Sequence, residues 1–173
     1  HRGHGHTLAK GADATKMMCE LFGRATGYNG GKGGSMHIAD FSVGMLGANG
    51  VVAAGLPIAV GAAQGLKIRG QDAIAVCFFG DGAINRGPFM EALNWAVVYH
   101  LPVLFVSGAE DPVGACGKGV RAAADLLRRA GVQDVEVKLY EGMRHEILNE
   151  PGRAQVYTEV VGWIEEHACQ STS

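Results

Sequence analysis

The chain has 173 residues, of which 47% are hydrophobic and 18% are charged, so it is long and apolar enough to fold around a core. Its 15 Lys and Arg against 17 Asp and Glu give a formal net charge of −2, which excludes a strongly basic nucleic-acid-binding surface and a polybasic membrane patch. The longest apolar run, residues 51–63, contains glycine and proline and is shorter than the roughly 20 residues of a membrane span.

The predicted elements alternate between helices and strands after a glycine-rich start. Residues 1–50 are predicted to be mostly loop, with a short helix over 15–23. Beyond them, apolar spacing predicts helices and continuous apolar runs predict buried strands. In chain order the predicted elements are helix 57–69, strand 73–79, helix 88–100, strand 102–106, helix 118–130, strand 135–140 and helix 153–167. This order predicts an α/β fold, a three-layer parallel sheet of about three strands with a Gly-rich, loop-rich N-terminal segment, and ligands at the C-terminal strand ends.

A candidate diphosphate and metal site follows the first predicted strand. The sequence Gly80-Asp81-Gly82-Ala83 lies between that strand and a helix. Glycines allow the backbone to approach an anion, the helix start offers free N–H groups, and Asp81 can hold a divalent cation that bridges phosphate oxygens. The alternative is a tight left-handed turn in which the glycines serve only the backbone.

Residues 1–106 resemble the alpha subunit of thiamine-diphosphate-dependent 2-oxo acid dehydrogenases, in the pyruvate/acetoin branch. The stretches that carry the resemblance are 2–6 (RGHGH), 31–37 (GKGGSMH), 47–52 (GANGVV), 80–94 (from GDG to EALN) and 101–103 (LPV). The resemblance implies an oxidoreductase that acts on an oxo group with a lipoyl disulfide acceptor. It also implies thiamine diphosphate and Mg²⁺ as cofactors. The implied partners are a small 2-oxo acid, a lipoyl carrier and a beta subunit that supplies the activating carboxylate.

The same resemblance implies a role for each matching residue. Arg2 pairs with the cofactor diphosphate, and Gly50 and Val52 contact the aminopyrimidine through their backbone. Asp81 ligates Mg²⁺, and the backbone of Gly80, Gly82 and Ala83 contacts the diphosphate. At the next metal-loop position the family has Asn, whereas this chain has Glu110, which could bind the cation but adds negative charge beside the diphosphate. Metal binding by His4, His6 and His37 is a weaker alternative to ordinary loop packing, because their spacing gives no helical i,i+4 pair.

Residues 101–167 resemble a different family, the C-terminal part of α/β-hydrolases of the lysophospholipase or monoacylglycerol-lipase type. The matching stretches are 101–114 (LPVLFVSGAEDPVG) and 138–146 (KLYEGMRHE). The resemblance makes Asp111 the triad acid and His145 the base, in the chain order typical of that fold. No GxSxG motif is present, and the nearest serines, Ser35 and Ser107, are not predicted on a strand-turn-helix elbow.

Two resemblances that meet at one strand suggest a fusion. The predicted organisation is a truncated dehydrogenase-like segment over 1–106 and a hydrolase-like segment over 107–173, packed as one α/β domain. Three functions stay open: an impaired dehydrogenase alpha-subunit fragment, a serine-hydrolase fragment without its nucleophile, and a non-catalytic fusion protein. Four scattered cysteines and an N-terminus without an apolar signal region favour reduced thiols and a cytoplasmic location.

Overall fold

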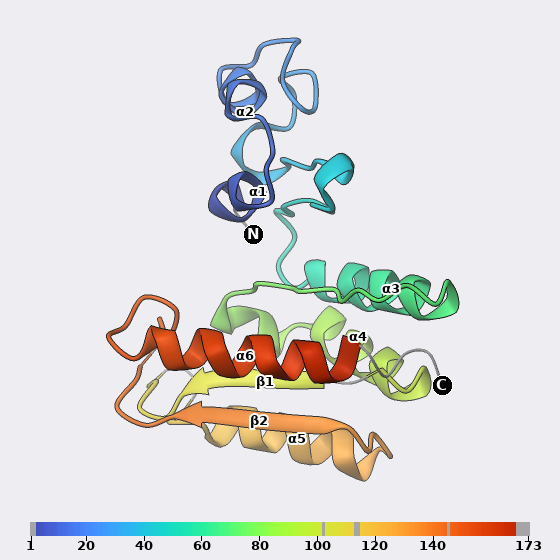
Figure 1. Cartoon of the computed structure of the whole chain (residues 1–173), viewed down its shortest axis with the longest axis vertical. Helices are drawn as coiled ribbons and strands as arrows, with labels where there is room; N and C mark the ends of the chain where they lie inside the picture. The colour runs from blue at the N-terminus through green and yellow to red at the C-terminus, as the bar shows by residue number, and fades with distance from the viewer. Residues whose placement is uncertain (1–2, 102, 113–114, 145, 169–173) are drawn as a thin grey trace. The chain divides into compact units, whose positions relative to one another are not determined.

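A computed structural model of the chain describes residues 3–101, 103–112, 115–144 and 146–168 (Figure 1). The chain divides into two compact units. The first consists of residues 1–55 and 78–86, and the second of residues 56–77 and 87–173.

The first unit is built from short helices and glycine-rich loops. Its helices are α1 (His4–Ala9), α2 (Ala14–Leu21) and the 3₁₀ turns η1 (Gly34–Met36), η2 (Phe41–Val43) and η3 (Asp81–Asn85). The predicted helix over 15–23 is confirmed as α2, which begins where the Asp13 carboxylate accepts hydrogen bonds from the amides of Thr15 (2.7 Å) and Lys16 (3.3 Å). Helix α1 was not predicted, because its six residues have no apolar period.

The second unit contains the longer helices and a small parallel sheet. Its elements are α3 (Gly55–Ile68), α4 (Gly87–Val98), β1 (Val103–Gly108), α5 (Lys118–Arg129), β2 (Val135–Tyr140) and α6 (Arg153–Ala168). Strand β1 pairs with β2 in parallel, from Val103 opposite Val135 to Gly108 opposite Tyr140. This mixture of helices with a parallel strand pair agrees with the predicted α/β class.

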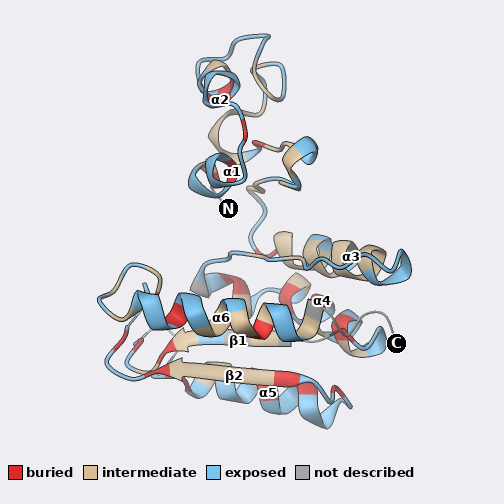
Figure 2. Ribbon diagram, in the orientation of Figure 1, coloured by how far each residue is buried: buried red, intermediate tan, exposed pale blue. Residues whose placement is uncertain are grey.

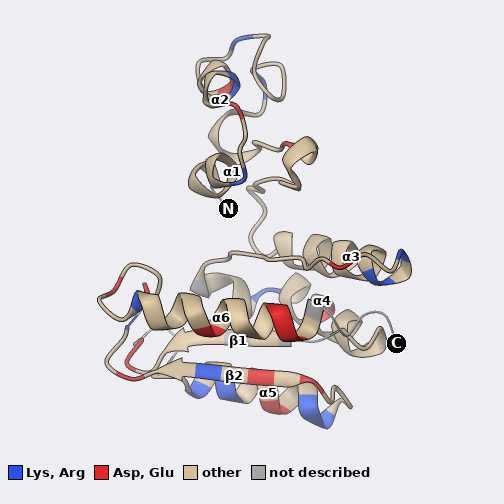
Figure 3. Cartoon of the chain, viewed as in Figure 1, with Lys and Arg blue, Asp and Glu red and all other residues tan. Residues whose placement is uncertain are grey.

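The core of the second unit consists of two apolar clusters at β2. Val135 packs with Ala124 and Leu127 of α5, and Val137 of β2 and Leu93 and Val97 of α4 border that cluster. The second cluster joins Tyr140, at the end of β2, to Val156 of α6 and to the loop between them. The opposite face of α5 is charged (Figures 2 and 3).

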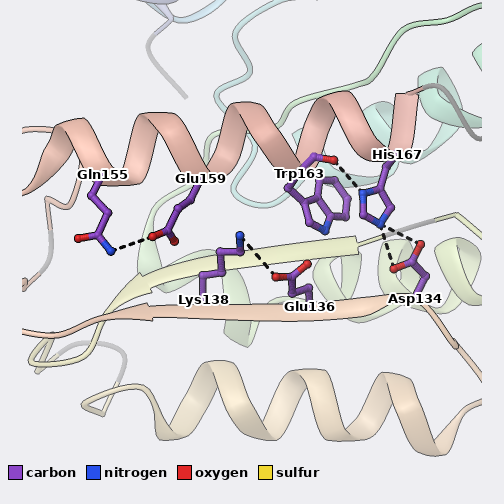
Figure 4. Close-up of polar contacts among 7 residues, drawn as sticks. All are labelled: Asp134, Glu136, Lys138, Gln155, Glu159, Trp163 and His167. Atoms are coloured by element: carbon purple, nitrogen blue, oxygen red, sulfur yellow. Dashed lines mark hydrogen bonds and ion pairs between the residues drawn. The ribbon is translucent and has the colours of Figure 1, made fainter.

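A polar seam lies between α6 and β2 (Figure 4). His167 Nδ1 lies 2.8 Å from the Trp163 carbonyl oxygen, and its Nε2 lies 3.2 Å from Asp134. Lys138 and Glu136 form an ion pair at 3.5 Å on β2. Because half-exposed pairs contribute about 0–1 kcal/mol each, the apolar clusters account for more of the stability than this seam.

The predicted strand over 73–79 is wrong. These residues form no strand and take part in no strand pairing of the described sheet, and four of their large hydrophobic side chains are exposed: Ile74 (37%), Val76 (60%), Phe78 (52%) and Phe79 (42%). An apolar run becomes a strand only when another backbone satisfies its N–H and C=O groups. Among the described residues the sheet therefore has two strands, and the predicted three-stranded sheet is not observed.

No helix in the described part of the chain is both long and apolar enough to cross a bilayer. Cys19, Cys77 and Cys116 are free thiols.

Candidate functional site

The Gly80–Ala83 turn follows irregular chain rather than the predicted strand. Gly80 precedes η3 with φ −80° and ψ 159°, and the amide of Ala83 donates to the Gly80 carbonyl oxygen at 2.9 Å. Ala83 is buried, whereas Gly80 and Gly82 are exposed. η3 begins at Asp81, the predicted metal ligand, whose side chain lies outside the described part of the structure.

The backbone of this turn does not itself require glycine. Gly80 and Gly82 both lie outside the left-handed region, and a Cβ atom at either position would have no heavy atom within 4 Å. The alternative of a tight left-handed turn is therefore wrong. The space beside both glycines leaves the backbone open to an approaching ligand.

Gly50 and Val52 belong to the same unit as this turn. Gly50 is half-buried, and a Cβ there would lie 3.5 Å from Met36 Cε and 3.6 Å from His37 Cε1. Val52 is 52% exposed. The His6 ring of α1 lies against the ring of Phe78, two residues before Gly80, with centroids 4.0 Å apart. Arg2, the predicted diphosphate partner, lies outside the described residues.

A buried carboxylate that the sequence analysis did not single out organises the loop before η1. Glu20 of α2 is 1% exposed. Its Oε2 accepts hydrogen bonds from the amides of Asn29 (2.7 Å) and Gly31 (2.8 Å), and its Oε1 from those of Gly33 (2.7 Å) and Gly34 (2.9 Å). All four donors are backbone groups, so the loop is held by one charged acceptor.

Protonation of Glu20 is expected to release this loop at low pH. Burial raises the pKa of Glu20, but the four amide hydrogen bonds outweigh it and hold the pKa below its ordinary value. The stabilisation is thus complete above the ordinary pKa of about 4.3 and is lost as the pH falls through the lower folded-state pKa. Amide exchange measured by NMR should show the protection of Gly31 and Gly33 falling only at a pH below the ordinary pKa of glutamate, while amides within α5 keep theirs.

The second group of predicted residues lies where β1 ends. The amide of Ala109 donates to the Tyr140 carbonyl oxygen and that of Glu110 to the Met143 carbonyl oxygen, each at 2.9 Å. These bonds join the loop after β1 to the loop after β2. Asp111 is buried, with 7% of its surface exposed, and the Glu110 side chain is exposed. The loop that leads to His145 is thus held against the Asp111 loop, although His145 itself lies outside the described residues.

Each of the two candidate serines has a hydrogen-bond partner of its own among the described residues. Ser107 Oγ donates to the carbonyl oxygen of its neighbour Gly108 at 3.4 Å. Ser35 Oγ lies 3.0 Å from His4 Nε2, and both residues belong to the first unit. Within the described residues no three His, Cys, Asp or Glu side chains are grouped to hold a metal ion.

Two features thus characterise the chain: a parallel α/β strand pair and an open, glycine-flanked acidic turn. The family model for the dehydrogenase E1 component matches residues 1–108, more than half of the sequence, so the chain belongs to that family. The model for the serine aminopeptidase family S33 matches residues 88–152. The two matches confirm both resemblances, and they overlap over residues 88–108, where α4 and β1 lie.

Curated relatives give the same assignment. Over 107 residues the chain is 58% identical to the alpha subunit of acetoin:2,6-dichlorophenolindophenol oxidoreductase from Bacillus subtilis, covering 62% of this chain and 32% of the relative. The alpha subunit of that name from Cupriavidus necator is 56% identical over 141 residues, covering 79% and 42%. The pyruvate dehydrogenase E1 component subunit alpha of Zymomonas mobilis is 36% identical over 168 residues, covering 95% and 46%. The chain spans a third to just under half of these relatives.

Proposed function

We propose that the chain is an alpha-subunit-like fragment of a thiamine-diphosphate-dependent pyruvate or acetoin dehydrogenase. In this proposal the Gly80–Ala83 turn binds the cofactor diphosphate and Asp81 binds its Mg²⁺. The observation that carries it is the open turn: two exposed glycines that no backbone strain requires, in a family whose members are dehydrogenase E1 components.

The described residues fit the diphosphate better than they fit the metal. The open backbone at Gly80 and Gly82 can approach an anion, and Gly50 and Val52 lie in the same unit. Asp81 supplies an oxygen ligand of the kind that Mg²⁺ prefers. The resemblance implies Asn where this chain has Glu110, and a charged carboxylate is not a neutral replacement for that ligand.

The chemistry of the proposed reaction belongs to the cofactor, which supplies a carbanion that attacks a 2-oxo group. This chain would hold the diphosphate, neutralise part of its charge through Mg²⁺ and Arg2, and orient the aminopyrimidine at Gly50 and Val52. The relatives are named as alpha subunits, which supports a beta subunit as partner, and the lipoyl carrier is the partner that the resemblance implies. Because the resemblance implies that a beta subunit supplies the activating carboxylate, we expect no turnover by this chain alone.

Calorimetric titration of the full chain tests the proposal. Thiamine diphosphate should bind in the presence of Mg²⁺, and Asp81→Ala should weaken that binding by at least about tenfold because a charged metal ligand is lost. Asp72→Ala removes an exposed carboxylate outside the turn and should leave the affinity unchanged. If the wild-type chain releases no binding heat at millimolar cofactor with Mg²⁺, the proposal is wrong.

The second half of the chain supports a fusion rather than a second enzyme. We propose that a dehydrogenase segment over 1–106 continues into a hydrolase-like segment over 107–173, with α4 and β1 common to both family matches. The acid Asp111 is retained at the end of β1, but the sequence has no GxSxG motif to supply the nucleophile. Short acyl esters should therefore be hydrolysed at the background rate, equally in wild type and His145→Ala. A wild-type rate that His145→Ala abolishes would establish the serine-hydrolase alternative instead.

A further inference from the structure

The Glu20 carboxylate is joined to the proposed cofactor site through a short, continuous path. It holds the amides of Gly33 and Gly34, and Gly34 is the first residue of η1. The last residue of η1 is Met36, and His37 follows it. Both side chains lie within 3.7 Å of where a Cβ atom of Gly50 would be. Gly50 is the residue that we propose to contact the aminopyrimidine.

Two further contacts stiffen this path. The Asn29 side-chain amide donates to the His37 carbonyl oxygen, so the two ends of the loop are tied to each other. Ser35 Oγ lies 3.0 Å from His4 Nε2, which joins η1 to α1. Because residues 29 and 37 are joined, a displacement of the Asn29 amide from Glu20 should also move the backbone of His37.

The loop also passes unusually close to α2 and the turn after it. A Cβ atom at Gly27 would lie 2.6 Å from the Glu20 amide nitrogen, and one at Gly31 would lie 2.6 Å from the Arg24 amide nitrogen. These approaches leave no room for side chains. The loop is therefore packed tightly against α2 and the turn after it, in addition to its hydrogen bonds with the Glu20 carboxylate.

We propose that Glu20 is a positioning residue of the cofactor site, which sets Met36 and His37 against the Gly50 backbone by holding the loop of residues 29–34. The inference rests on the proposed function, since Gly50 matters only if the cofactor binds there. A carboxylate suits this role because it only accepts hydrogen bonds and has four lone-pair positions for four donors. Glutamine has the same shape, but its amide group turns N–H donors toward two of the loop amides.

The test compares Glu20→Gln and Glu20→Ala with Glu165→Gln, which alters an exposed carboxylate of α6. Amide exchange of Asn29, Gly31, Gly33 and Gly34 is measured by NMR in the full chain, together with the resonances of His37 and Gly50. In Glu20→Gln the four amides should exchange on the order of tenfold faster, because hydrogen bonds to a charged group are lost. The resonances of His37 and Gly50 should shift, and thiamine diphosphate should bind several-fold more weakly.

Formate distinguishes the lost carboxylate from a damaged fold. In Glu20→Ala the four amides face a space that a small carboxylate can fill, so formate should restore both the protection and the wild-type resonances of Gly50. In Glu20→Gln the side chain still occupies that space, and formate should have no effect. Failure of formate to restore either signal in Glu20→Ala would contradict the role of Glu20.

The outcomes separate this inference from the proposed function. If exchange speeds up in Glu20→Gln while the resonances of His37 and Gly50 and the cofactor affinity stay unchanged, Glu20 holds only its own loop and the inference is wrong. If the wild type binds no cofactor although Glu20→Gln shifts the Gly50 resonance, the coupling stands and the proposed function fails. In that case Glu20 still sets the Gly50 backbone, but it has no role in a cofactor site.

Discussion

Replacing Gly108 with alanine should lower the free energy of unfolding of the second unit by about 3 kcal/mol, the upper range for forcing an atom into a filled site. Gly108 ends β1 where the loop after β2 crosses it. A Cβ atom there would overlap the carbonyl oxygens of Met143 and Arg144 and lie 2.7 Å from the Met143 carbonyl carbon. These are backbone atoms, which have no rotamer by which to move away.

Urea unfolding followed by circular dichroism would measure this loss, with Gly61→Ala as the matched control. Gly61 lies within α3, and its added Cβ would meet no heavy atom within 4 Å. Alanine is the better helix former by about 0.5–1 kcal/mol, so the control should be neutral or slightly stabilised. Equal unfolding midpoints for the two variants would show that the loop after β2 can yield at Gly108.

The contact of Gly108 with the loop after β2 also affects the acidic residues that follow β1. Its neighbours Glu110 and Asp111 are the predicted acidic residues, and the Glu110 amide bonds the same Met143 whose carbonyl oxygen crowds Gly108. If the alanine variant separates the two loops, the hydrogen bond from the Glu110 amide to the Met143 carbonyl oxygen should be lost with it. The hydrolase-like half thus depends on a close backbone approach that no motif in the sequence marks.

Helices α2 to α6 and the two observed strands were predictable because each has a local signal. The alternation in residues 135–140 follows the two faces of β2, whose Val135 packs toward α5. In α5 the buried residues Ala124 and Leu127 lie opposite a charged face, and the last turn of the helix contains Arg128 and Arg129. Signals of this kind lie within one turn or strand and do not depend on what the rest of the chain does.

The absence of a strand over residues 73–79 could not be predicted from a local signal. Their apolar run is as continuous as that of β1, yet Val76 and Phe78 stay exposed. A parallel strand is stable only with neighbours on its edges, and those neighbours are distant in sequence. Here the run connects the two compact units, the boundary falling between Cys77 and Phe78, so it lies in no single core. Composition alone could not reveal this.

The four hydrogen bonds from loop amides to Glu20, here called the Glu20 clamp, were not predicted, for a different reason. Its donors lie nine to fourteen residues away, and they are backbone amides of a glycine-rich loop that looked unstructured. One signal was available: Glu20 follows Met17 by three residues, and both are buried on the same face of α2. A carboxylate on the apolar face of a helix needs donors from elsewhere, and glycine-rich chain can supply backbone amides.

Gly31→Ala should disrupt this clamp far more than Gly30→Ala, although the two glycines are neighbours. Both have positive φ, +63° at Gly30 and +75° at Gly31, so each alanine incurs about 1–2 kcal/mol of left-handed strain. At Gly30 the added Cβ meets nothing within 4 Å, whereas at Gly31 it lies 2.6 Å from the Arg24 amide nitrogen and 2.7 Å from the Arg24 carbonyl oxygen. We expect about 3 kcal/mol for Gly31→Ala, because overpacking against backbone is added to the strain.

The exposed Lys32, next to Gly31, provides the measurement. Trypsin cleaves after lysine only when the surrounding loop opens, so the cleavage rate reports how often the amides of Gly31 and Gly33 leave Glu20. Cleavage after Lys32 should be about 5- to 30-fold faster in Gly30→Ala than in wild type because of the left-handed strain alone, and it should be clearly faster again in Gly31→Ala. Equal rates in the two variants would mean that positive φ alone, and not the approach to Arg24, fixes the loop, and the clamp would then tolerate a side chain where the structure leaves no room for one.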